Sequence, residues 1–194
     1  SFKDKIRLST PVTGVKREKE AVVVSSAQGE ERYDAVFFAC HSDQALRLLE
    51  QPTASEQQVL GAIKYQENEV LLHTDASILP KRKTAWAAWN YHLLENDQGQ
   101  VPVTYNMNIL QGLDSDQTFC VTLNNSNAID QTKVLKRLQY HHPIYTQESV
   151  AAQARQSEIN TDRLYFCGAY WRYGFHEDGV VSALNAIEKF KRDL

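Results

Sequence analysis

LYFCGAYWRYGFHEDGVVSA, residues 164–183, is the stretch that decides the fold of this chain. It opens with an apolar run from Leu164 to Cys167, which has the length of a buried strand. Glycines at positions 168, 174 and 179 then interrupt an aromatic-rich loop. After the loop, apolar residues recur at helical spacing, at Val181, Leu184, Ile187 and Phe190. The stretch therefore predicts a strand, a glycine-bounded loop and a helix. Because a helix N-terminus exposes unpaired N–H groups and a partial positive charge, such a loop suits an anion or an electron-rich ring edge.

The segment GAYWRYGFHEDG, residues 168–179, resembles the C-terminal flavin-binding motif of the FAD-dependent amine-oxidase superfamily. It is most similar to the GAYWxYGFHEDG signature of bacterial amine-oxidase-like NAD/FAD-binding proteins. In that family the last strand leads to a glycine, and the following loop and helix N-terminus lie against the pyrimidine side of the isoalloxazine ring. From the residues alone, an ordinary strand-to-helix turn with core aromatics is the alternative.

The resemblance implies FAD as the cofactor and small-molecule substrates as partners. Its cofactor-binding residues would be Val12, Gly168, Gly174, Phe175, His176, Glu177, Asp178, Gly179 and Val180. The N–H groups at the helix entrance would stabilise negative charge at flavin N1 and O2 on reduction. His176, as an acid or base, and Phe175, which faces the flavin in the family, are the candidates for a catalytic role.

Two departures from the family pattern affect the substrate prediction. Phe175 stands where amine oxidases often carry the tyrosine of their amine-binding cage, so the hydroxyl is lost. Ala169 stands where family members commonly carry an acid that meets the ribityl or pyrophosphate region. Glu177 and Asp178 have a second interpretation, as charges that complement the helix dipole. No metal site is predicted, because three consecutive ligand-type residues rarely converge on one ion.

Composition describes an ordinary globular chain of 194 residues, with 42% hydrophobic and 23% charged residues. A net charge of −3 argues against a nucleic-acid-binding face. We see neither a secretory signal nor an apolar run long enough to span a bilayer. The three cysteines, Cys40, Cys120 and Cys167, form no CxxC pattern, which favours reduced thiols and a cytoplasmic protein.

A flavoprotein of this type should also carry a strand–GxGxxG–helix unit for the pyrophosphate, and none of the eight glycines forms that pattern. The chain begins at Ser1 in what reads as mid-domain sequence. We therefore expect the C-terminal part of a longer protein, without its N-terminal Rossmann unit, made by design or by proteolysis. Such a fragment should be inactive, bind FAD weakly or not at all, and be able to dimerise through the surface left open.

The expected fold is α+β, part of an α/β FAD/NAD(P)-binding fold, in three segments. We expect residues 1–45 to form a β-meander of the FAD-binding domain. Residues 46–158 should form a substrate-side domain with an antiparallel sheet and helices. Residues 159–194 should form the closing FAD-binding strand, loop and helix. In the meander the expected strands are 6–8, 12–17, 21–26 and 33–40, with a turn at 28–31. The resemblance places the backbone at Pro11–Val12 against the adenine ring.

Two helices should follow the meander, one capped by Ser42 and one opened by a capping box at Ser55. The middle of the chain then predicts an antiparallel sheet from strands at 70–74, 84–92, 101–108 and 119–123, with a turn at 95–100. On such a strand Trp86 and Trp89 would lie on opposite faces. Trp89 and Tyr91 are the substrate-lining candidates, and sheet-core packing is their alternative.

Apolar spacing at Val134, Leu135, Leu138 and Tyr140 predicts a return to helix over 130–155, with that helix ending at His141-His142-Pro143. A final helix or extended segment is predicted for 147–159. The functional interpretation is a FAD-dependent oxidoreductase that oxidises a small or lipid-like substrate by hydride transfer to flavin. The alternative is a non-enzymatic module that binds a small ligand, in which the closing motif is only structural.

Overall fold

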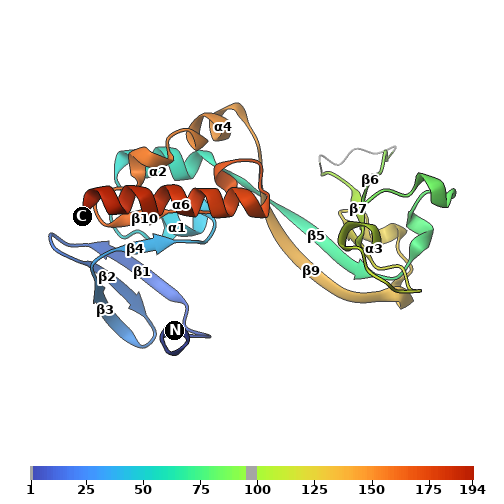
Figure 1. The fold of residues 1–194 in the computed structure, drawn as a ribbon, viewed down its shortest axis with the longest axis horizontal. Coiled ribbons are helices and arrows are strands. Elements are labelled where there is room, and N and C mark those ends of the chain that lie inside the picture. The colour runs from blue at the N-terminus through green and yellow to red at the C-terminus, as the bar shows by residue number, and fades with distance from the viewer. Residues whose placement is uncertain (1, 95–99) are drawn as a thin grey trace. The chain divides into compact units, whose positions relative to one another are not determined.

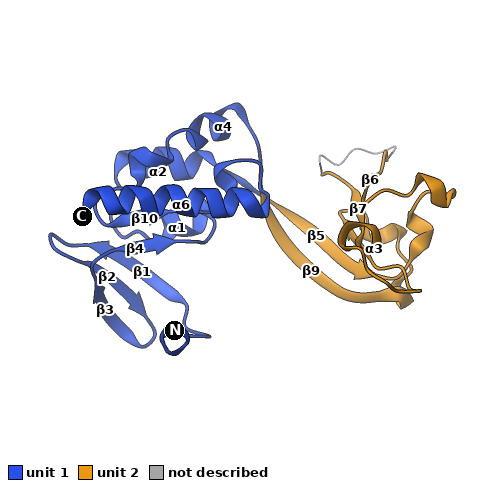
Figure 2. Ribbon diagram, viewed as in Figure 1, with its two compact units in different colours: residues 1–65, 143–194 blue, residues 66–142 orange. Residues whose placement is uncertain are grey.

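The computed structural model describes residues 2–94 and 100–194, which form helices and three β-sheets (Figure 1). The chain divides into two compact units, residues 1–65 with 143–194 and residues 66–142 (Figure 2). The fold class is α+β, as predicted.

The first unit begins with the predicted antiparallel meander. Its strands are β1 (Val12–Arg17), β2 (Val22–Ser26) and β3 (Gly29–Tyr33). The prediction of a strand at 6–8 was wrong, since only a 3-10 turn, η1 (Lys3–Lys5), precedes β1 among the described residues. The predicted turn at 28–31 was also too long: Gly29 pairs with Ser26, so the tight turn ends there and β3 starts at once.

The predicted strand over 33–40 is two pieces in two sheets. Tyr33 closes β3 opposite Val22, and β4 (Val36–Phe38) leaves the meander to pair in parallel with β10 (Leu164–Phe166). Apolar periodicity cannot show this change of sheet, because both pieces are extended. The consequence is that β4 and β10 end at the same edge, where ligands bind in open parallel sheets.

The described residues of the first unit form five helices. They are α1 (Ser42–Leu48), α2 (Ala54–Ala62), α4 (Gln147–Gln153), α5 (Gln156–Ile159) and α6 (His176–Asp193). Of these, α5 and α6 contact β10. A further 3-10 turn, η6 (Ala169–Trp171), lies between β10 and α6. The core of the unit is apolar and fully buried at residues such as Leu60, Ile159, Leu164 and Phe166.

The helix starts differ from the predicted caps. Ser42 is the first residue of α1, and its hydroxyl bonds to Ile63 O and the Tyr65 hydroxyl instead of capping the helix. The capping box of α2 is Thr53 with Glu56, two residues before the predicted one. Glu56 is 1% exposed, accepts a 2.8 Å bond from Thr53 N and pairs with Arg17, so one carboxylate joins α2 to β1.

The predicted strand, loop and helix of the closing stretch are confirmed by β10, the following loop and α6. The buried line of α6 is Asp178, Ser182 and Ala186, and not the predicted apolar set, of which Leu184 and Ile187 are exposed. Small residues at Ser182 and Ala186 let the helix approach the strand pair closely.

The second unit is a five-stranded sheet in the order β6-β7-β8-β5-β9. Its strands are β5 (Tyr65–His73), β6 (Trp89–Tyr91), β7 (Val103–Asn106), β8 (Cys120–Leu123) and β9 (Val134–Pro143). The short helix α3 (Met107–Gln111) follows β7. Four 3-10 turns complete the unit: η2 (Ala76–Ile78), η3 (Lys83–Ala85), η4 (Ser126–Ala128) and η5 (Gln131–Lys133).

Two predictions in this region were wrong. The helix over 130–155 is instead η5, the long strand β9 and α4, because hydrogen bonding along β5 overrides a helix-like spacing of apolar residues. The strand over 84–92 shrinks to β6, since Lys83–Ala85 turns as a 3-10 helix. Positions 95–99 of the predicted turn lie outside the described residues. Residues 147–159, predicted as a final helix or extended segment, form the two helices α4 and α5.

The three cysteines are free thiols, with Cys120 and Cys167 buried and Cys40 half-buried. In the part of the chain that the structure describes, none of the helices has the length and apolar character to cross a bilayer.

Candidate functional site

The candidate site is the edge of the first unit where β4 and β10 both end. The two strands run in register from Leu164 opposite Val36 to Phe166 opposite Phe38, and Cys167 N continues the ladder to Phe38 O at 2.9 Å. Gly168 then turns the chain toward α6. Its N–H donates to Ser182 Oγ at 2.9 Å, which ties the loop to the helix.

Gly168 must be glycine because of a close approach. A Cβ at this position would lie 2.4 Å from a ring carbon of Tyr170, far inside van der Waals contact. Tyr170 and Trp171 are buried, and their rings are 5.1 Å apart. Among the described residues, neither the Tyr170 hydroxyl nor the Trp171 indole N–H has a partner with hydrogen-bond geometry. Burial raises the pKa of Tyr170, so its hydroxyl stays protonated.

Gly174 is required by its backbone. Its φ of +89° is a conformation that residues with a Cβ rarely adopt, and a Cβ would lie 2.8 Å from the Tyr145 hydroxyl. Burial, with the nearby Asp178 carboxylate, raises the pKa of Tyr145, which is therefore a neutral phenol beside the loop.

Gly179 is different, because nothing in the described chain requires it. A Cβ there would lie 3.7 Å from Ala169 N and 3.9 Å from Ala169 Cβ, which are ordinary contacts. The residue lies in the first turns of α6, where glycine is a poor helix former. Packing within the described chain therefore does not explain this glycine.

The entrance of α6 has a buried side, which carries Asp178, and an exposed side, which carries Phe175 and Val180. Asp178 is 6% exposed, and its carboxylate accepts bonds from Tyr173 N at 3.2 Å and Phe175 N at 3.1 Å. Its charge thus holds the loop and complements the helix dipole. By contrast Phe175, at 56% exposed, and Val180, at 53%, face outward together with His176 and Glu177. The structure thus brings the predicted residues 174–180 together at one exposed helix entrance.

Val12 lies elsewhere in the same unit. It is partly exposed on β1 and borders, with Pro11, an apolar cavity of about 620 Å³. Phe37, Phe38 and Cys40 line the same cavity, so it reaches the end of β4. A bulge between Val12 and Gly14 interrupts the pairing with β2, which frees backbone groups at this point.

The substrate-lining candidates Trp89 and Tyr91 are on β6 in the second unit. Both point to the same exposed face, and the Trp89 ring meets Tyr105 edge-on at 5.2 Å. The prediction that Trp86 and Trp89 lie on opposite faces of one strand was wrong, because Trp86 precedes β6. Its indole N–H donates to Pro80 O at 2.8 Å.

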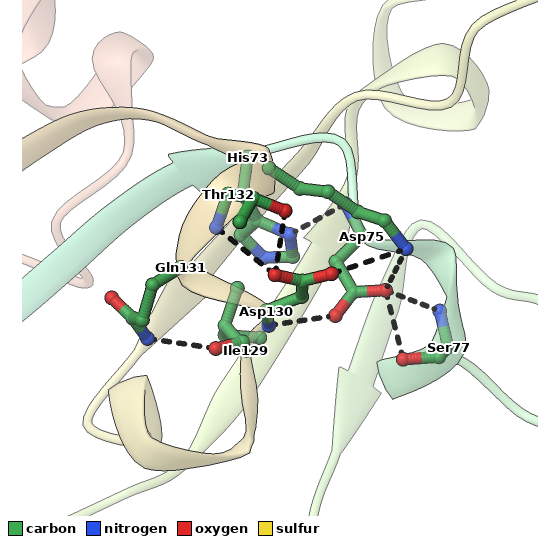
Figure 3. A network of polar contacts seen from close by, with 8 residues as sticks. His73, Asp75, Ser77, Ile129, Asp130, Gln131 and Thr132 are labelled. Atoms are coloured by element: carbon green, nitrogen blue, oxygen red, sulfur yellow. Dashed lines mark hydrogen bonds and ion pairs between the residues drawn. The ribbon is translucent and has the colours of Figure 1, made fainter.

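Sequence reasoning missed a polar network in the second unit. Asp75 is 2% exposed, and its carboxylate accepts bonds from Ser77, from Asp130 N at 2.9 Å and from Lys133 Nζ at 3.2 Å (Figure 3). Desolvation raises the pKa of Asp75, but these donors together lower it below the ordinary value. The adjacent His73 is fully buried, and its Nδ1 accepts from Asp75 N at 3.1 Å. The signal available in the sequence was the pair His73 and Asp75 at the end of an apolar run.

A metal centre is not evident. Within residues 2–94 and 100–194, the structure groups no three His, Cys, Asp or Glu side chains in a way that could hold an ion. His176, Glu177 and Asp178 diverge, since Asp178 turns inward while the other two are exposed.

Comparison with known proteins identifies the fold. No family model matches the sequence, and no curated protein matches it. Among solved structures, a provisionally named protoporphyrinogen oxidase from Exiguobacterium sp. 255-15 is similar at a TM-score of 0.67 and 14% identity, over 97% of this chain and 48% of that one. A putrescine oxidase with redesigned cofactor binding is similar at 0.63 and 11%, over 98% and 50%. A CLA-producing fatty acid isomerase from P. acnes is similar at 0.57 and 12%, over 93% and 47%.

The chain therefore has the fold of about half of each of these proteins. At such low identities the likeness shows the fold alone, and the activity follows only from the site.

Proposed function

We propose that this chain supplies the flavin-contacting helix entrance and a substrate wall of a FAD-dependent oxidoreductase. The observation that carries the proposal is Gly179. It lies on an exposed helix entrance at the carboxyl edge of two parallel strands, and the chain's own packing does not account for it. A flat ring lying against the backbone of this turn would account for it.

The residues present fit a flavin. The first N–H groups of α6, at His176 and Glu177, have no intrahelical partner and carry the positive end of the helix dipole. They would hold the electron-rich pyrimidine edge, with the Phe175 ring beside it. The bulged backbone at Val12 would meet the adenine. Flavin, when bound, supplies the hydride-accepting chemistry, and the protein supplies position, electrostatics and exclusion of water.

Asp178 serves this site indirectly. By accepting from Tyr173 N and Phe175 N it fixes the loop that presents Phe175 and His176. His176 is exposed at this entrance, whereas the Asp178 carboxylate is engaged with the loop backbone. We keep His176 and Phe175 as the catalytic candidates on this basis.

The fold does not select the substrate. Its relatives in structure include an amine oxidase and a fatty acid isomerase. Phe175 lacks the hydroxyl of an amine-binding cage, so the proposal is an oxidoreductase whose substrate need not be an amine.

The test is the visible absorption spectrum of the full-length protein, recorded with and without added FAD, beside that of the 194-residue chain. We expect flavin bands in the full-length protein and their loss from the chain. Bleaching of the bands by a reducing substrate would show the oxidoreductase activity. A full-length protein that takes up no FAD would overturn the proposal and favour a non-enzymatic ligand-binding module.

A further inference from the structure

The loop between β10 and α6, residues 168–175, presents the proposed flavin contacts on an exposed surface. In its second half Tyr173 is 73% and Phe175 56% exposed. Burial fixes only the start of the loop, at Tyr170 and Trp171. Exposed segments with few buried apolar contacts open locally at little cost in free energy. The position of Phe175 and of the α6 entrance therefore depends on polar contacts of the loop backbone.

Those polar contacts come from two helices. On the α6 side, the Asp178 carboxylate accepts from two N–H groups of the loop. On the α4 side, the side-chain amide of Gln153 donates from Nε2 to Tyr170 O at 2.9 Å and to Arg172 O at 2.6 Å. The loop backbone is thus held through its N–H groups by α6 and through its carbonyls by α4.

Helix α4 is itself a fixed support for Gln153. A capping box closes its first turn, and the helix packs against α2. Ala152, the neighbour of Gln153, is 4% exposed and belongs to the core of the unit. Tyr145, just before the helix, places its hydroxyl 2.8 Å from the position of a Cβ at Gly174. Residues 145–153 therefore meet the loop at both of their ends.

We propose that Gln153 is a positioning residue for the flavin, which orders the loop so that Phe175 and the first N–H groups of α6 are in place before the ring binds. The inference rests on the proposed function, because that function places the ring at this entrance. Gln153 acts through the loop and is not a catalytic residue. A loop that is ordered in advance costs less entropy on binding, so the affinity for the ligand is higher.

The test compares Gln153→Met with Gln131→Met in the full-length protein. Methionine has a similar chain length and no N–H donor. Gln131 is the matched control in the second unit, because its Nε2 donates to Ile129 O at 2.7 Å and to Ser126 O at 3.1 Å. Since Gln131 also accepts a bond from Arg137, its replacement should lower the Tm of the apoprotein at least as much as that of Gln153.

Only Gln153→Met should change the bound flavin. We expect its Kd for FAD to rise about tenfold, because two hydrogen bonds that order the loop are lost. The visible circular dichroism of the bound flavin should also change, because the ring then lies beside a less ordered loop. Gln131→Met should keep the flavin signal and bind FAD within twofold of the wild type. An unchanged Kd and dichroism in Gln153→Met would overturn the inference. So would an equal change in Gln131→Met, since the effect would then be general destabilisation.

Hydrogen–deuterium exchange of the apoprotein separates this inference from the proposed function. The amides of residues 173–176 should exchange faster in Gln153→Met than in the wild type, and at the wild-type rate in Gln131→Met. Unchanged exchange in Gln153→Met would refute its role in the loop whether or not flavin binds. A wild-type protein that takes up no FAD would instead refute the proposed function, and faster exchange would then still identify Gln153 as the residue that orders the loop.

Discussion

Replacing Gly179 with alanine should separate the needs of the fold from those of a cofactor. The new methyl group would lie 3.7 Å from Ala169 N and 3.9 Å from Ala169 Cβ, so the chain itself accommodates it. Alanine is the better helix former by about 0.8–1 kcal/mol in a helix interior. Near the start of α6 we expect a gain of roughly 0.5–1 kcal/mol in the free energy of unfolding. For a chain of this size that is about 1–4 °C in Tm.

Flavin binding should change in the opposite direction. If the ring lies against the backbone of this turn, the added methyl group overpacks the contact, at a cost of about 1–3 kcal/mol. Since about 1.4 kcal/mol is tenfold in affinity, the Kd for FAD should rise roughly 5- to 150-fold. A variant that is more stable but binds its cofactor less well is difficult to explain by general damage.

Gly61→Ala is the matched control. Gly61 lies within α2, and a Cβ there would be 3.7 Å from Leu46 Cδ2, so its internal fit is like that of Gly179. It should give the same gain in Tm and leave the FAD affinity unchanged. The assays are thermal unfolding of the 194-residue chain and titration of FAD into the full-length apoprotein, followed by quenching of the FAD fluorescence. An FAD affinity of Gly179→Ala within twofold of the wild type would refute the placement of the ring.

Three further perturbations test the structure. Gly174→Ala places a Cβ on a residue with a φ of +89° and 2.8 Å from the Tyr145 hydroxyl. Urea unfolding should therefore show that the free energy of unfolding falls by about 1–3 kcal/mol. An unchanged urea midpoint would contradict the strain. Glu56→Ala removes a capping box and leaves Arg17 without its ion-pair partner. In the same assay the free energy of unfolding should fall by about 2–4 kcal/mol. A decrease below ~1 kcal/mol would show that the ion pair does not stabilise the fold. Burial lowers the pKa of His73, so the unfolded chain, with a histidine pKa of about 6.5, takes up the proton first. The contribution of neutral His73 to stability is therefore fully present above pH ~6.5, and it should be lost as the pH drops toward the lowered pKa of the folded state. A urea midpoint that is higher at pH 5 than at pH 7 would contradict this.

The closing motif was readable from the sequence because its determinants are local. Strand, glycines and helix lie within residues 164–193, and the apolar run and the helical spacing each have one solution there. Gly168 and Gly174 could be recognised as special positions, but only the structure separates them from Gly179. The reason is that the neighbours that decide, Tyr170, Tyr145 and Ala169, are seen only in three dimensions.

The errors came from non-local pairing. Spacing at Val134 and Leu138 fits a helix turn, yet the segment is a strand because β5 offers it a partner far away in sequence. The break between β3 and β4 has the same origin, since β4 pairs with β10 about 130 positions later. No periodicity reports on a partner at that distance, and tertiary pairing overrides weak local preference.

A ladder of buried hydrogen bonds, from His73 through Thr122 and Thr104 to His92, was invisible for a related reason. His73, Thr104 and Thr122 are on three strands, and only the register brings them together. Read along each strand, the threonines look like residues of a solvated face.

The two faces of this sheet are one solution to a single constraint. Because side chains alternate, strands that present Trp89, Tyr105 and Val121 on one side must place their other residues on the opposite side. His73, Thr104 and Thr122 are buried on that opposite side, and buried polar groups are tolerated only when they are hydrogen-bonded. The ladder from Asp75 N to His92 meets that condition with no charged member. It follows that a substitution that leaves one hydroxyl of these hydrogen bonds unsatisfied should destabilise the strands that they join.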